Sequence, residues 1–172
     1  VSMPHHHSAE VMIYIGVGSR YETAHKAGVS HFLEHMLFLG TDKFPDPAEK
    51  KKQTEHGGTR NAFTSFENTN YFFDVNAAYL PEALDRFAQF FIAPRFDAAY
   101  VDREKNAVEA EYQMGLKSDP RRGLDVLQAV MNPAHPYSQF SVGSLQTLAV
   151  GRTVLFGTLL LALYAVIWLL TG

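Results

Sequence analysis

Two histidines and a glutamate interrupt an otherwise apolar stretch, VSHFLEHMLFLG, and they are the residues of this sequence best suited to chemistry. His31 and His35 are four residues apart, so on a helix both imidazoles project from one side and can approach a single metal ion. Glu34 lies on the adjoining side, where it can reach a water at that ion without being a ligand. The H-x-x-E-H spacing reverses the H-E-x-x-H of zinc proteases. Taken alone, it leaves a second interpretation open, in which two buried histidines bond to the backbone.

A metal site of this kind needs a further ligand, because a catalytic zinc usually keeps three from the protein. The chain has no cysteine, so the candidates are carboxylates, and three glutamates lie in the segment DREKNAVEAEY. Glu104 and Glu111 are seven residues apart, about two helical turns, and therefore share one face of a helix. Apolar residues border that face, and a carboxylate buried without a partner is costly. Glu109 is interpreted as part of a solvated face, whereas Glu104 and Glu111 are candidates for the metal site.

The elements that must position these residues can be read from hydrophobic periodicity and turn signals. Residues 29–39 are expected to form an apolar helix that stops at Gly40. The β-rich runs within 59–76 are split by ENTN and predict a hairpin. A strand is expected at 10–18, a largely polar loop at 41–58, and helices at 81–93, 97–117 and 120–131. The fold class that follows is α+β, with an antiparallel or mixed sheet packed on helices.

The expected helix at 81–93 has a predicted buried face. Leu84, Phe87, Ala88 and Phe91 fall on one side at helical spacing.

Composition narrows the function classes. The 172 residues are 47% hydrophobic with a net charge of −3, which is ordinary for one globular domain and gives no electrostatic case for a nucleic-acid partner. The absence of cysteine excludes disulfides, thiol nucleophiles and iron–sulfur clusters. The chain begins without methionine and without a targeting pattern, so it is interpreted as a fragment or a processed product.

The C-terminal tail differs from the rest of the chain. Residues 153–170 carry no charge, follow Arg152, and are just long enough to cross a bilayer core of about 30 Å. We therefore divide the chain into a domain at 1–150 and an apolar tail at 151–172, predicted to be a helix that could anchor the protein in a membrane. A buried helix of a larger protein and an out-of-frame junction are the alternatives. The compartment is undetermined.

Four motifs, in order, resemble the insulin-degrading-enzyme or pitrilysin family of inverzincin metallopeptidases. They are HFLEHMLFLGT, HGGTRNAFTSFENTNYFFDV, LDRFAQFFIAPRFD and DREKNAVEAEY, and the resemblance runs from about Val11 to Leu148. It implies a truncated pitrilysin-like peptidase domain that binds one zinc ion per chain. The ligands it implies are His31, His35 and Glu111, with Glu34 as the general base. Glu104 then becomes a supporting residue that orients a ligand.

The resemblance also implies a peptide substrate that adds as an extra strand along residues 60–65, where Asn61, Ala62 and Phe63 match the family's positions. Family members have two homologous halves that close around the peptide, and this chain holds less than one domain of such a half. A second half or subunit is thus expected to complete the cleft. Two functions stay open. One is a zinc endopeptidase acting on unfolded peptides, and the other is a catalytically incompetent, membrane-attached structural or peptide-binding fragment of the same family.

Overall fold

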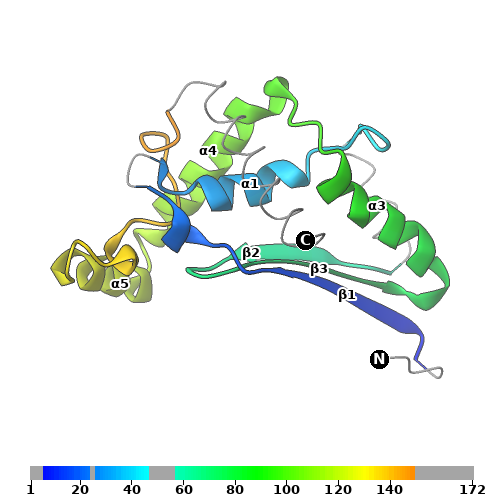
Figure 1. Ribbon diagram of the computed structural model, residues 1–172, viewed down its shortest axis with the longest axis horizontal. Helices are drawn as coiled ribbons and strands as arrows, with labels where there is room; N and C mark the ends of the chain where they lie inside the picture. Colours follow the sequence, from blue (N-terminus) through cyan, green and yellow to red (C-terminus); the bar gives the residue numbers. More distant parts are fainter. Residues whose placement is uncertain (1–5, 24–25, 47–56, 150–172) are drawn as a thin grey trace.

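Residues 6–23, 26–46 and 57–149 are described by the computed structural model, in which helices pack against one face of a small antiparallel sheet (Figure 1). The strands are β1 (Ser8–Ile15), β2 (Arg60–Thr64) and β3 (Thr69–Asn76), in the spatial order β1-β3-β2. The helices are α1 (Val29–Leu37), α3 (Leu80–Ile92), α4 (Ala98–Gly115) and α5 (Asp119–Val130), with short 3-10 helices η1 (Ser19–Tyr21), η4 (Ala77–Tyr79) and η5 (Pro136–Ser138). The predicted α+β class is confirmed, and the sheet that the described residues form is antiparallel.

Alternation along the strands decides which face of the sheet carries the core. On the central strand β3, Tyr71, Phe73 and Val75 are at most 1% exposed and point toward the helices. The predicted hairpin is present, with β2 and β3 joined by four residues and closed by a bond from Ser65 N to Asn68 O of 2.8 Å. Because β3 pairs with β1 on its other side, β2 lies at an edge of this sheet.

Helix α1 lies over the sheet, flanked by α3 and α4 (Figure 1), and contacts both β2 and α4. Phe32 and Met36 are fully buried on its core side. Its N-terminus is satisfied by Glu22, whose carboxylate accepts hydrogen bonds of 2.6 Å from the backbone N–H groups of Gly28 and Ser30. The helix ends at Leu37, two residues before the predicted end, and the turn at Gly40 follows with φ of 110°.

Helix α3 closes the core with aromatic rings. Phe87 packs on Phe73 with ring centroids 4.9 Å apart, and Phe91 packs on Tyr71 at 5.2 Å. The buried face is rotated from the predicted one, since Phe90 is buried whereas Leu84 is 45% exposed. The ring of Phe90 is held by Phe38, which follows α1, at 5.3 Å.

Helix α4 begins as the sequence predicts, with Asp97 accepting a bond of 2.9 Å from Ala99 N. Val101 and Val108 are fully buried on its inner side. Both the predicted apolar tail helix at 153–170 and much of the expected loop at 41–58 lie outside the described residues, so the division at residue 150 stays a prediction. Within the described ranges, none of the helices is long and apolar enough to cross a membrane.

Candidate metal centre

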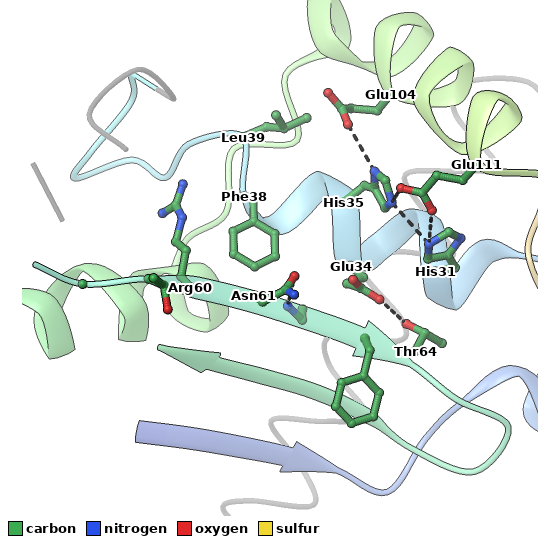
Figure 2. Close-up of a pocket in the computed structure, with 14 residues that line it drawn as sticks. His31, Glu34, His35, Phe38, Leu39, Arg60, Asn61, Thr64, Glu104 and Glu111 are labelled. Carbon is green, nitrogen blue, oxygen red and sulfur yellow. Dashed lines mark hydrogen bonds and ion pairs between the residues drawn. The ribbon is translucent and has the colours of Figure 1, made fainter. Parts of the chain in front are cut away.

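Two helices bring together the histidine pair and a distant carboxylate (Figure 2). His31 and His35 lie on the side of α1 that faces α4, and Glu111 reaches them from α4. The Nε2 atoms of the histidines are 3.3 Å apart. His31 Nε2 is 3.2 Å from one oxygen of Glu111, and His35 Nε2 is 3.5 Å from the other. Residues separated by 80 positions in sequence thus converge on a single point.

These separations can be compared with what a metal ion requires. Two ligand atoms that each lie 2.0–2.1 Å from a tetrahedral zinc are about 3.3–3.4 Å from one another. The Nε2–Nε2 separation of 3.3 Å matches this value, and each Nε2 lies within about 0.2 Å of it from the Glu111 oxygen that faces it. Two imidazoles and one carboxylate are also a known ligand set of catalytic zinc. The residues present therefore fit a zinc ion in both spacing and chemistry.

The outward nitrogen of each imidazole has its own partner. His31 Nδ1 lies 2.7 Å from the carbonyl oxygen of Val142, and because a carbonyl can only accept, Nδ1 carries the proton. His35 Nδ1 is 3.3 Å from the Glu104 carboxylate, whose other oxygen is held by Arg103 at 3.0 Å. Both bonds leave Nε2 as the nitrogen with a free lone pair in the neutral ring. Partners of the Nδ1 atoms thus orient both imidazoles so that Nε2 can bind a metal.

The Val142 carbonyl is placed by a contact between two glycines. Gly28 and Gly143 both have φ of 90°, and a Cβ built on Gly28 would lie 2.1 Å from the Gly143 Cα. Glu109 secures the same segment, since its carboxylate accepts a hydrogen bond of 2.8 Å from Leu145 N. The position of the segment therefore depends on the two backbones approaching more closely than any side chain would allow.

Glu34 lies beside the ligands but bonds elsewhere. Its side chain comes from α1 on the side of β2, and its Oε2 accepts a hydrogen bond of 2.7 Å from the Thr64 hydroxyl (Figure 2). The residue is 8% exposed. Burial raises the pKa of Glu34, and the opposing effects of the Thr64 hydrogen bond and the nearby histidines do not cancel this. A raised pKa makes the carboxylate a stronger base, which suits it to accept a proton and return it.

The charges of the ligand residues depend on one another. Hydrogen bonds with His31 and then with His35 hold the pKa of the Glu111 carboxyl well below its usual range. Burial of the His35 ring acts to lower its pKa, but its hydrogen bond to Glu111, the negative charge of Glu111 and a further hydrogen bond to Glu104 outweigh burial and raise the pKa. Protons on the imidazoles and a metal cation therefore compete for the same atoms.

A pocket opens in front of this cluster, between α1, α4 and the edge strand β2. Its lining includes the ligands, Glu34, Glu104, Phe38, Leu39 and the stretch 58–64. Asp74 N donates to Thr59 O, so by the alternation of an antiparallel ladder the backbone groups of Arg60, Ala62 and Thr64 face away from β3. The pocket thus lies against an edge whose hydrogen-bonding groups, within the described part of the chain, are not used by another strand.

The three residues predicted to bind substrate lie on β2 with different orientations. Ala62 is 9% exposed and faces the helices, whereas the Phe63 ring is 48% exposed on the other face and contacts Phe72. The side chain of Asn61 bonds to its own strand, because its Oδ1 accepts a hydrogen bond of 2.9 Å from Ala62 N. Their role in binding substrate stays a prediction.

Comparison with known proteins identifies the family to which this arrangement belongs. A family model described as Insulinase (Peptidase family M16) matches residues 1–139, most of the chain. The chain belongs to the insulinase family. Its fold is similar to that in a crystal structure of pitrilysin, with a TM-score of 0.85 and 34% identity over 92% of this chain and 18% of that one.

Two relatives show how much of an insulinase-family protein this chain covers. Bovine insulin-degrading enzyme (Bos taurus) is 46% identical over 149 residues, which cover 86% of this chain and 15% of the relative. A Schizosaccharomyces pombe protein that carries zinc protease in its name is 42% identical over 146 residues, 84% of this chain and 15% of that protein. The chain therefore spans about 15% of the length of these insulinase relatives.

Two features of this pocket and its surroundings were not predicted from the sequence. The Val142 carbonyl gave no signal, because every residue has a backbone carbonyl and only the fold decides where it points. Arg60 was also missed, although strand alternation from Ala62 would have placed it on the pocket side. The side chains of His31, Glu34, His35, Glu104 and Glu111 lie together around one point, as their spacing led us to expect.

Proposed function

We propose that this chain is the metal-bearing part of a zinc endopeptidase that hydrolyses internal bonds of unfolded peptides. The supporting observation is the convergence of His31, His35 and Glu111, whose facing ligand atoms are 3.2–3.5 Å apart, beside a buried carboxylate from Glu34. A purely structural zinc site has four protein ligands, whereas three ligands leave a position for water or substrate. The chemistry of the site thus favours catalysis over structural stabilisation.

The bound zinc would supply a Lewis acid that polarises the scissile carbonyl and acidifies water. Glu34 is the proton carrier in this proposal. Thr64 holds its Oε2, so Oε1 can accept the proton from the attacking water and then give it to the leaving amine nitrogen. The Val142 carbonyl and Glu104 hold the two imidazoles in place while this happens.

The edge strand β2 is the proposed binding site for the peptide. An extended peptide could pair with the outward backbone groups of Arg60, Ala62 and Thr64, which would run it past Glu34 and the metal ligands. The Asn61 amide oxygen occupies the Ala62 N–H, so the peptide would have to displace it. A second homologous half or subunit is proposed to cover the other side of the peptide.

The test combines metal analysis with peptide cleavage. We expect about one zinc per chain by mass spectrometric metal analysis, and cleavage of a quenched, unstructured peptide by the zinc-loaded chain. Glu34→Gln keeps the ligands, so zinc should stay bound while the cleavage rate falls by roughly 10²–10⁴. Glu10→Gln, on the exposed face of β1, removes the same charge and is the control.

The outcomes separate the two candidate functions. A zinc-loaded chain that binds the peptide but leaves it intact would support the catalytically incompetent fragment. A cleavage rate for Glu34→Gln within a few-fold of the parent would exclude Glu34 as the base.

A further inference from the structure

Arg60 stands out among the pocket residues because it is a cation among groups that serve a metal site. It is the first residue of β2, it is half-buried, and its side chain points into the pocket (Figure 2). The guanidinium carbon lies 5.2 Å from the ring centre of Phe38 and 5.7 Å from that of Phe90. Two aromatic rings therefore fix the position of this charge.

The charge of Arg60 lacks an anionic partner within residues 6–23, 26–46 and 57–149. Arg103, at the same site, is bonded to Glu104, whereas the contacts of Arg60 are with rings. Burial lowers the pKa of Arg60, yet a guanidinium stays charged at any ordinary pH. A cation–π contact offsets only part of the cost of removing a charge from water. The guanidinium is thus available to bind an anion.

The strand places this cation at a defined distance from the proposed reaction centre. Arg60, Ala62 and Thr64 share one face of β2, and Thr64 is the residue bonded to Glu34. Four residues of strand span about 13 Å. In a peptide paired along β2, side chains that face the pocket recur about every 7 Å, so one or two such positions separate Glu34 from Arg60.

We propose that Arg60 forms a carboxylate subsite that selects peptides by an anionic group a few residues from the scissile bond. The inference rests on the proposed binding of peptide along β2. The guanidinium presents a planar fork of N–H donors that matches a carboxylate with two parallel hydrogen bonds, and the flanking rings hold the fork in one orientation. An aspartate or glutamate side chain and the C-terminal carboxylate of a short peptide offer the same chemistry.

The test measures binding of fluorescein-labelled unstructured peptides to the zinc-loaded chain by anisotropy, in the Glu34→Gln background so that bound peptide is not consumed. The parent peptide has glutamine at every polar position and an amidated C-terminus. One series moves a single glutamate along it, and one peptide carries a free C-terminal carboxylate instead. We expect a peptide with one carboxylate at the right position to bind on the order of 10-fold more tightly than the parent peptide. The series that shows the gain identifies the source of the carboxylate.

Variants of Arg60 assign the preference to this residue. Arg60→Gln should reduce the preference to within about two-fold, and Arg60→Lys should keep part of it, because a lysine retains the charge without the fork. Arg95→Gln removes the same charge from an exposed position outside the pocket and should leave the preference intact. Arg60→Met keeps an aliphatic side chain between the rings and replaces Arg60→Gln if thermal unfolding shows that the latter is poorly folded.

Two results would overturn the subsite. The first is a carboxylate preference that is undiminished in folded Arg60→Gln or Arg60→Met. The second is equal binding of all the peptides by the chain with Arg60 intact. That second result would exclude the subsite but not the binding of peptide along β2. If none of the peptides binds, the proposed function fails and the subsite fails with it.

Discussion

The close approach of Gly28 and Gly143 allows a sharp prediction about metal affinity. In Gly28→Ala the new methyl group would lie 2.1 Å from Gly143 Cα and 2.4 Å from Gly143 N, both backbone atoms. The segment that contains Val142 must therefore retreat by about 1.3 Å or more to reach ordinary van der Waals contact. The hydrogen bond between His31 Nδ1 and the Val142 carbonyl, now 2.7 Å, would then be stretched beyond useful length.

Loss of this bond leaves the His31 ring free to rotate and to change tautomer. Removing a partner behind a metal ligand typically weakens metal binding by about 10- to 100-fold, which corresponds to roughly 1.4–2.7 kcal/mol. Alanine at positive φ adds a cost of about 1–2 kcal/mol to folding. Gly28→Ala is thus expected to lower both zinc affinity and stability.

The control separates the two effects. Gly57 also has positive φ, 70°, but a Cβ built on it meets nothing within 4 Å, so Gly57→Ala carries backbone strain without displacing the segment. Zinc affinity would be measured by competition with a chromophoric chelator, and stability by urea unfolding of the metal-free chain. Both variants should lose stability, and only Gly28→Ala should lose zinc affinity. Equal zinc affinity in the two folded variants would refute the role of the Val142 carbonyl.

Further predictions concern other parts of the site and the tail. Glu104→Gln should weaken zinc binding about 10- to 100-fold. Glu111→Gln should weaken it more, because this change removes a charged ligand. If competition with a chelator shows the reverse order, the roles assigned to Glu104 and Glu111 would be exchanged. Thr64→Val should cost about 1–3 kcal/mol in urea unfolding, since it leaves the buried Glu34 carboxylate short of a partner, and Thr64→Ser should restore most of that. Deleting 153–170 should end a requirement for detergent, and an undeleted 172-residue chain found wholly in the aqueous phase would contradict membrane attachment.

Much of the fold was predictable because local patterns and tertiary packing agree. The β-rich runs on either side of ENTN predicted the hairpin, and the Asp97 cap predicted the start of α4. The buried face of α3 was harder, because Leu84 and Phe90 both border the apolar stripe and periodicity alone does not rank them. Packing against Phe38, from a different part of the chain, buries Phe90 and leaves Leu84 exposed.

The candidate site divides in the same way. Spacing of four and of seven residues on helices made His31, His35, Glu104 and Glu111 candidates, because helix geometry is nearly invariant and the histidine pair needs a further ligand. The contact between Gly28 and Gly143 could not be read from the sequence, since it joins segments more than 100 residues apart and involves only backbone atoms. Interactions of this type depend on the assembled fold rather than on any residue pattern.

All nine residues of α1 are buried or half-buried, so the helix that carries both histidines has no fully exposed residue. A helix this short is barely stable in water by itself, and α1 can persist only after β2 and α4 have packed against it. The unfolded chain therefore has no preassembled pair of imidazoles with which to capture zinc. Specific zinc uptake is expected to follow folding in time, and at excess zinc its rate after dilution from denaturant should level off at the rate at which native structure forms.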